Sequence, residues 1–246
     1  AYVLGLAFVK VNKIKKIVIG RDARQESEAV FWSLVSGLIS AGAKVFDLGV
    51  CSTPELFFAV GYDNYDAGCI VTASHSPKGE TGFKFCGRDG VVFGLNTGLK
   101  KIKTIANKEL LRLQKSGALL TLPDHRSKIK FVSVAEDYKK FIHSFVDVKK
   151  MSGMKIIIDA SNGSGSRLAE TVMSDLPLKC VNVNFGQPDK YPDHGPNPLL
   201  PENQKTIKRQ IIKNRADWGV MFDGDGDRAI FFDEEGRLIE PYYINC

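Results

Sequence analysis

Several features that would place the protein in a membrane or outside the cell are missing from the sequence. No run of about 18 consecutive apolar residues occurs, so no transmembrane helix is predicted and no membrane partner is expected. Residues Ala1–Lys10 lack the charged-then-apolar pattern of a secretory signal peptide. The five cysteines are widely scattered and form no C-x-x-C pair, which argues against a zinc site or a disulfide framework. We therefore expect reduced thiols and a cytoplasmic location.

Acidic residues are scarce in one long stretch. Between Leu95 and Lys150 the sequence has thirteen Lys and Arg but five Asp and Glu, although the whole chain carries a formal net charge of only +6. A nucleic-acid surface would combine such a stretch with aromatic residues or a groove-fitting motif, and neither is evident. We interpret the stretch as the solvated face of helices, with an anion-attracting rim as the alternative, and expect no nucleic-acid partner.

Composition and pattern indicate a globular α/β protein. With 246 residues, of which 43% are hydrophobic and 25% charged, the chain is long enough to bury a sizeable core. Short apolar runs alternate with amphipathic stretches, an order typical of helices that cover a largely parallel sheet. We expect two three-layer α/β domains with mixed, largely parallel sheets, at residues 1–126 and 127–246, joined near a connector at 117–127.

The expected elements follow this alternation. The predicted strands are Lys16–Gly20, Lys44–Leu48, Ala67–Thr72, Gly82–Cys86, Lys155–Asp159, Cys180–Asn184, Trp218–Phe222 and Ala229–Asp233. The predicted helices are Glu26–Ala41, Thr53–Val60, Asn96–Ser116, Val134–Val148, Arg167–Ser174 and Glu202–Asn214. A loop with five prolines, residues 186–201, separates the last two of these helices.

The strongest chemical signal is a loop of alternating aspartate and glycine. Asp223, Asp225 and Asp227 are separated by single glycines and followed by Arg228. Glycine permits a tight turn that directs all three carboxylates at one point, and carboxylate oxygens are the ligands that hard divalent cations take. Three carboxylates held together without a cation would be electrostatically unfavourable. The loop therefore predicts a divalent-metal site between two strands.

Two other kinds of aspartate loop fit less well. An EF-hand has Asp at positions 1, 3 and 5 and Glu at position 12, which Glu234 matches, but its position 6 is Gly and here is Arg228. The flanking residues are also strand-like rather than helical. The Asp-x-Asp after an apolar strand is similar to the haloacid-dehalogenase phosphatases, but their further downstream motifs are not found in the sequence after Asp227.

A second candidate site is the stretch Thr72–Lys78 (TASHSPK), directly after a predicted strand. Ser74 at such a turn is a possible nucleophile or phosphoryl carrier. The G-x-S-x-G motif of serine hydrolases is absent, and His75 is poorly placed to accept the proton of the adjacent serine. Taken alone, the stretch is more consistent with an ordinary loop.

Together the two loops resemble those of the α-D-phosphohexomutases, the phosphoglucomutases and phosphomannomutases. The phosphoserine loop of that family reads T-A-S-H-N-P, here TASHSP with Ser74 as the serine, and its metal loop reads D-G-D-G-D-R, which residues 223–228 match letter for letter. Further stretches agree in the same order: Gly20–Arg24, Asp47–Gly49, Thr53–Pro54, Thr81–Lys84, Pro192–Pro198 and Pro201–Asn203.

The resemblance implies a reaction and a set of roles. Phosphoserine at Ser74 would add nearly two negative charges and, with the three aspartates, would complete the ligand shell of Mg²⁺. The phosphoserine would transfer its phosphoryl group to a hexose monophosphate, and the resulting bisphosphorylated sugar would reverse its orientation in the site. The serine would then be rephosphorylated from the other end of the sugar. The net result is the interconversion of hexose 1- and 6-phosphates. Lys84 is implied as a proton-transfer or phosphate-contacting residue, and His75 as a neighbour of the phosphoserine. Arg228 and, more weakly, Arg21 are implied in substrate binding; a salt bridge is the alternative for Arg21.

The sequence also departs from the family pattern. Ser76 and Thr81 stand where the family has Asn. The family has four domains, and the resemblance covers only the first two, without the N-terminal strand of the first. We therefore expect a fragment of a four-domain enzyme that continues covalently into domains III and IV and has little activity by itself. The choice between mannose and glucose stays open, with glucosamine less favoured. A metal-dependent phosphatase and a non-catalytic metal-binding fragment remain alternatives.

Two further features are interpreted as structural. Residues Ser161–Ser166 follow a strand and open a helix, but Leu168 occupies the third Gly position of G-x-G-x-x-G. We expect a tight turn there rather than a phosphate cradle. His194 lies among prolines and is expected to order its loop rather than to bind a metal.

Overall fold

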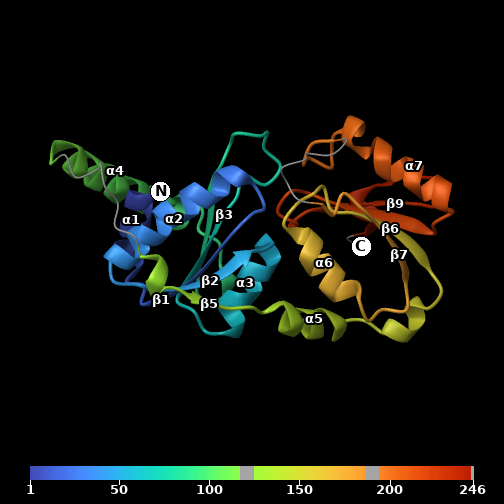
Figure 1. Cartoon of the computed structure of the whole chain (residues 1–246), viewed down its shortest axis with the longest axis horizontal. Coiled ribbons are helices and arrows are strands. Elements are labelled where there is room, and N and C mark those ends of the chain that lie inside the picture. Colours follow the sequence, from blue (N-terminus) through green and yellow to red (C-terminus); the bar gives the residue numbers. More distant parts are fainter. Residues whose placement is uncertain (117–124, 187–193, 245–246) are drawn as a thin grey trace.

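In the computed structural model the chain forms two α/β units that lie side by side (Figure 1). The structure describes residues 1–116, 125–186 and 194–244. Each unit contains a five-stranded sheet, in the order β4-β3-β1-β2-β5 in the first and β10-β9-β8-β6-β7 in the second. The expected fold class, two α/β domains with mixed and largely parallel sheets, is confirmed.

The first sheet is parallel except at one edge. Strands β1 (Lys16–Arg21), β2 (Lys44–Val50), β3 (Ala67–Val71) and β5 (Lys130–Phe131) run parallel, whereas β4 (Phe83–Gly87) is antiparallel to β3. Side chains alternate between the two faces of a strand, so the apolar run of β1 buries both faces. Ile17 and Ile19 pack on one side with helices α1 (Tyr2–Asn12), α2 (Gln25–Ser40) and α4 (Lys100–Lys115). Val18 packs on the other side with α3 (Thr53–Tyr62).

The second sheet has the same layering. Strands β6 (Lys155–Asp159), β7 (Lys179–Val183) and β8 (Trp218–Phe222) are parallel, and β9 (Ala229–Phe232) and β10 (Leu238–Ile239) form an antiparallel edge. Ile157 packs with α7 (Lys205–Asn214) on one face, and Ile156 and Ile158 pack towards α6 (Gly165–Met173) on the other. Helix α5 (Ala135–His143) contacts α3 and α6 and so bridges the two units (Figure 1), and the short helix α8 (Pro241–Ile244) follows β10.

The predicted strands are all present, but the helices differ in detail. Helix α1 was not predicted because Leu6, Ala7, Phe8 and Val9 are all buried, so the segment has no polar face and no helical periodicity. The helix expected over Val134–Val148 ends at His143 and is followed by a short 3₁₀ turn. The helix expected over Glu202–Asn214 begins as a 3₁₀ turn. The helix expected from Asn96 starts at Lys100, after a distorted turn.

The boundary between residues 126 and 127 stays a prediction. Most of the connector expected at 117–127, and part of the proline-rich loop, lie outside the described residues. Beyond that connector, β5 pairs with β2, so residues 130 and 131 belong to the first sheet.

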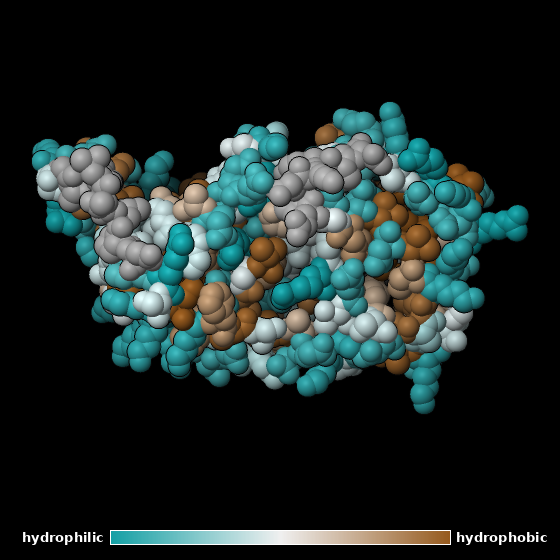
Figure 2. Space-filling model, viewed as in Figure 1, coloured by the Kyte–Doolittle hydropathy of each residue, from teal (hydrophilic) through white to brown (hydrophobic). Residues whose placement is uncertain are grey.

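Hydrophilic residues cover most of the face shown in Figure 2, with hydrophobic residues scattered between them. In the part of the chain that the structure describes, no helix combines the length and the apolar character needed to cross a bilayer.

The backbones of helices α1 and α2 approach each other closely at two glycines, Gly5 and Gly37. A Cβ atom at Gly37 would overlap the carbonyl oxygen of Tyr2, and one at Gly5 would lie 2.6 Å from the carbonyl oxygen of Leu34. At Gly61, also helical, an added Cβ would meet nothing within 4 Å. The packing of α1 on α2 therefore requires the missing side chain at Gly37, and Gly61 offers a matched control.

We predict that Gly37→Ala lowers the free energy of unfolding by about 1–3 kcal/mol, because the two helices must separate to admit the methyl group. Gly61→Ala is expected to leave stability unchanged or to raise it by up to about 1 kcal/mol, because Ala is favoured over Gly in a helix. Urea unfolding followed by circular dichroism measures both. Equal effects of the two substitutions would contradict this view of the interface.

Candidate functional site

The candidate site lies where loops from the two sheets meet. Ser74 follows β3 and Thr53 follows β2 in the first sheet, and Asp223 directly follows β8 in the second. Lys84 stands near the start of the antiparallel strand β4, opposite Ile70, so it reaches the same edge as the ends of the parallel strands. Side chains far apart in the sequence are thereby brought to one place, at the carboxyl ends of parallel strands, where α/β proteins usually bind ligands.

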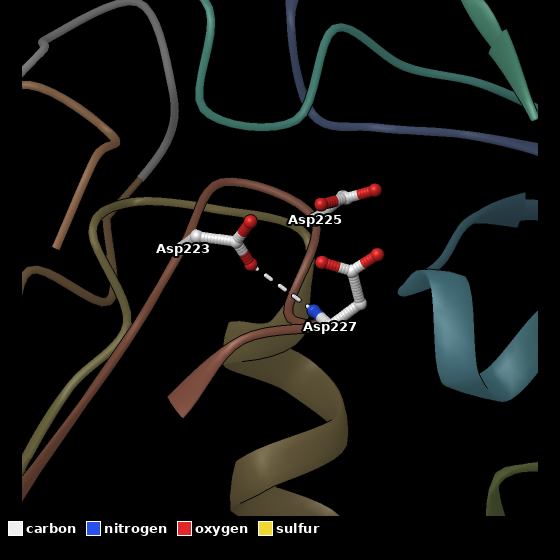
Figure 3. Close-up of side chains that lie close together, drawn as sticks. All are labelled: Asp223, Asp225 and Asp227. Carbon is white, nitrogen blue, oxygen red and sulfur yellow. Dashed lines mark hydrogen bonds between the residues drawn. The ribbon is translucent and has the colours of Figure 1, made fainter. Parts of the chain in front are cut away.

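The three aspartates converge in a loop that is held by its own hydrogen bonds. One carboxylate oxygen from each aspartate can be chosen so that the three atoms all lie within 4.8 Å of one another. Figure 3 shows the three side chains grouped within the loop. Asp223 Oδ1 accepts hydrogen bonds from the backbone N–H groups of Asp227 (3.1 Å) and Arg228 (3.2 Å). Asp223 and Asp225 are fully buried, and Asp227 is partly exposed. The predicted grouping is present.

Side chains of the first unit reach into this loop. Ser74 Oγ donates a hydrogen bond to Asp223 Oδ2 at 3.0 Å. Lys84 Nζ lies 2.6 Å from Asp225 Oδ2 and 2.5 Å from Asp227 Oδ2. His75 Nδ1 is 3.4 Å from Ser74 Oγ, so it borders the serine at the limit of a hydrogen bond. One site that belongs to both units therefore brings together five residues singled out in the sequence: Ser74, Lys84 and the three aspartates.

The electrostatics of the loop show how closely its charges are packed. Burial, and then the charges of Asp225 and Asp227, raises the pKa of Asp223 to about 6. Burial alone would raise the pKa of Asp225 too, but hydrogen bonds from Lys84 and Thr53 and the charge of Lys84 hold it below its usual value. The pKa of Lys84 is raised: burial lowers it, but its bonds to Asp225 and Asp227 outweigh this effect.

The donor set fits a hard divalent cation. Asp223, Asp225, Asp227 and the Ser74 hydroxyl supply oxygen atoms only, which is what Mg²⁺ and Ca²⁺ prefer. Asp225 Oδ1 is buried and has no hydrogen-bond partner. Buried carboxylate oxygens are normally paired, so this atom has coordinating capacity that the surrounding protein does not use.

Arg24 supports the backbone on which Ser74 sits. Ser74 has a left-handed φ of 53°, which is unfavourable for a residue with a side chain. The buried guanidinium of Arg24 donates to the carbonyl oxygens of Ser74 (2.8 Å), Ser76 (2.7 Å) and Pro77 (2.9 Å). Asp22 pairs with Arg24 at 3.4 Å and also accepts from the N–H of Ala73. The charged pair thus holds the serine loop in its strained conformation.

A turn of the second unit supports the aspartate loop from the other side. The N–H of Ser164 donates to the carbonyl oxygen of Gly224 at 3.0 Å, and Ser161 Oγ donates to that of Phe222 at 2.6 Å. Residues 161–166 therefore form the expected tight turn. His194 Nδ1 lies 2.8 Å from the carbonyl oxygen of Gly195, and its Nε2 lies 3.1 Å from Asp159 Oδ2, in agreement with a loop-ordering role.

Two family models match most of the chain. Residues 1–112 match the family model described as phosphoglucomutase/phosphomannomutase, alpha/beta/alpha domain I, and residues 136–236 match the model for domain II. The chain belongs to the phosphoglucomutase/phosphomannomutase family. It is 34% identical over 236 residues to a phosphomannomutase of Vibrio cholerae, an alignment that covers 94% of this chain and 49% of that protein.

Other members of the phosphoglucomutase/phosphomannomutase family show the same coverage. A phosphomannomutase of Escherichia coli is 31% identical over 250 residues, with 99% of this chain and 53% of the relative aligned. A solved structure of a phosphoglucomutase/phosphomannomutase family protein from Burkholderia thailandensis superposes with a TM-score of 0.76 at 25% identity, over 98% of this chain and 52% of that one. The chain spans about half the length of the curated relatives it matches.

Two residues singled out from the phosphohexomutase motifs do not join the cluster. Arg21 pairs with Glu28 (2.5 Å) and Asp47 (3.7 Å), and its guanidinium lies over the ring of Phe31. These contacts lie within the first unit, as the salt-bridge alternative for Arg21 expects. The side chain of Arg228 is exposed, while its backbone N–H binds Asp223.

Sequence reasoning missed two residues that shape the site, Arg24 and Thr53. Both lie in stretches that agree with the mutase family, Gly20–Arg24 and Thr53–Pro54. The motif signal was therefore present, but only the structure shows which side chain of each stretch contacts the site.

Arg24→Lys is expected to lower the free energy of unfolding by about 2–4 kcal/mol, because an ammonium group cannot bind three carbonyl groups in one plane as the guanidinium does. Arg88→Lys, at an exposed ion pair with Asp66, is expected to change stability by less than about 0.5 kcal/mol. Urea unfolding measures both effects. Hydrogen exchange at the amides of the serine loop provides a local readout, and unaltered exchange in Arg24→Lys would rule out the supporting role.

Proposed function

We propose that this chain carries the phosphoryl-transfer part of a magnesium-dependent phosphohexomutase, which interconverts the 1- and 6-phosphates of a hexose, mannose or glucose. The observation that carries the proposal is the hydrogen bond from Ser74 Oγ to Asp223 inside a cluster of three carboxylates. A hydroxyl group held beside a divalent-metal site is suited to carry a phosphoryl group. Relatives named phosphomannomutase and phosphohexose mutase support the same reaction class.

The residues that would hold Mg²⁺ are Asp223, Asp225, Asp227 and Ser74. The bound ion would neutralise the negative charge of the phosphoryl group on Ser74 and so favour its transfer to an anionic sugar phosphate. The free oxygen of Asp225 supports this assignment, because it is a buried atom of the site that has no hydrogen-bond partner among the residues that the structure describes.

The roles of the chain's own residues follow from their positions. Ser74 Oγ forms the O–P bond when it is phosphorylated and loses it when the phosphoryl group passes to a sugar hydroxyl, whose proton must leave. Lys84 stands beside Asp225 and Asp227 and is the candidate to move that proton or to contact the phosphate. His75 borders the Ser74 hydroxyl. Arg228 and Arg21 remain proposed substrate contacts, and the exposure of Arg228 beside Asp227 makes it the better supported of the two.

We also propose that residues 1–126 and 127–246 are domains I and II of a four-domain enzyme, although residues 130 and 131 pair into the sheet of domain I. The other domains would bind and reorient the sugar. Family matches to a domain I and a domain II support this, as does the coverage of about half of each relative. The isolated chain is then expected to have little mutase activity. Free thiols at Cys51, Cys69, Cys86 and Cys180 are consistent with the proposed cytoplasmic location.

Phosphorylation of Ser74 is the direct test. After incubation with a hexose 1,6-bisphosphate and Mg²⁺, the intact mass of the chain is expected to increase by one phosphoryl group, and Ser74→Ala is expected to abolish the increase. Ser76→Ala removes a neighbouring hydroxyl group and should keep it. Equal labelling of Ser74→Ala would refute the assignment, and steady release of inorganic phosphate from the substrate would favour a phosphatase instead.

Metal binding is tested separately by titration calorimetry. The chain is expected to bind one Mg²⁺, and Asp225→Asn is expected to weaken binding by at least about tenfold, because it removes a ligand charge from the site. Glu234→Gln removes an exposed carboxylate beyond the end of β9 that lies away from the loop, and it should leave the affinity unchanged. Similar losses in the two variants would point to general attraction by surface charge rather than to a site.

A further inference from the structure

Thr53 makes two contacts with Asp225 across the two units. Its Oγ1 donates a hydrogen bond to Asp225 Oδ2 at 2.5 Å, and its backbone N–H donates to the carbonyl oxygen of Asp225 at 2.9 Å. Thr53 is 1% exposed, so water does not compete for these bonds. The start of α3 in the first unit therefore holds both the backbone and the side chain of a residue in the second.

The hydroxyl of Thr53 is not needed to begin its own helix. Ser52 is the N-cap of α3, and its side chain accepts the hydrogen bond from the N–H of Glu55 at 3.2 Å. Pro54 then occupies the first turn, where the missing N–H does no harm. The short bond from Thr53 to Asp225 thus serves the aspartate loop rather than the helix.

The two oxygens of Asp225 are used differently. Oδ2 accepts from Thr53 Oγ1 and from Lys84 Nζ, at 2.5 and 2.6 Å. Oδ1 is buried and has no partner. The two oxygens of a carboxylate are equivalent, so donors on one of them fix the plane of the group and with it the position of the other oxygen. Donors on Oδ2 therefore hold Oδ1 in its buried position, where it has no hydrogen-bond partner.

We propose that Thr53 is a positioning residue of the metal site: its hydroxyl holds Asp225 Oδ2 and thereby presents Oδ1 to the cation. This inference rests on the proposed Mg²⁺ site and adds to it a residue outside the ligand set. Partners that orient metal ligands typically contribute about 10–100-fold to metal affinity. Because Thr53 and Asp225 belong to different units, the affinity of the site depends on how the units are held together.

The test is Mg²⁺ binding by titration calorimetry, with Mn²⁺ and its electron paramagnetic resonance signal as a second probe. Thr53→Val has nearly the same shape but no hydroxyl group, and it is expected to raise the Kd about 10–100-fold. Thr53→Ser keeps the hydroxyl and should stay within about threefold of the unmodified chain, whereas Thr53→Ala should bind as weakly as Thr53→Val. Ser52→Ala disturbs the helix start without touching Asp225 and should bind normally.

Several outcomes would overturn the inference. If the unmodified chain binds Mg²⁺ and Thr53→Val binds it equally well, the metal site stands and the role of Thr53 is wrong. A loss in Ser52→Ala as large as that in Thr53→Val would show that only the helix start matters. If the unmodified chain binds no Mg²⁺, the proposed metal site fails and this inference fails with it. Should Thr53→Val not fold, equal affinities of Thr53→Ser and Thr53→Ala would still refute the role of the hydroxyl.

Discussion

Three carboxylates within 4.8 Å of one another are the constraint on which the rest of the site depends. Their mutual repulsion, with burial, must be balanced by groups that donate hydrogen bonds or carry positive charge. The loop supplies part of this balance through the backbone N–H groups of Asp227 and Arg228. The first unit supplies the rest through Ser74, Thr53 and Lys84. Neither unit holds the cluster alone, so the site exists only where the two sheets meet.

The two units can meet at the site because the backbones of three loops pack closely there. A Cβ atom at Gly224 would lie 2.6 Å from the carbonyl oxygen of Ser74, and the carbonyl oxygen of Gly224 itself accepts the N–H of Ser164. Gly224 is thus held between the serine loop and the turn at 161–166, and any larger residue would push the aspartates away from Ser74. Within the first unit, Arg24 binds three carbonyl oxygens of the serine loop, among them that of Ser74. The strained conformation of Ser74 is therefore stabilised from both units.

Much of the fold could be predicted from patterns in the sequence. Strands such as Lys155–Asp159 and Trp218–Phe222 are short apolar runs between turn residues, and the structure has them with the predicted bounds. Helix α1 could not be predicted in this way, because five consecutive residues in its middle, Gly5–Val9, are buried and give it no polar stripe with a helical period. The site was predicted where a motif names its residues, as at Ser74 and Asp223. Arg24 and Thr53 were not, since a motif shows that a stretch matters but not which side chain of it reaches the neighbouring unit.

The sequence by itself therefore determined the two α/β units, the aspartate loop, the serine loop and the family to which they belong, because these depend on local spacing and residue type. Only the tertiary structure decided that Lys84 and Thr53 share Asp225, that Oδ1 of that residue is left free, and that Arg21 lies in a salt-bridge network. The physical reason is that contacts between residues 172 positions apart follow from how two sheets pack, and no pattern of neighbouring residues encodes the direction of a single side chain.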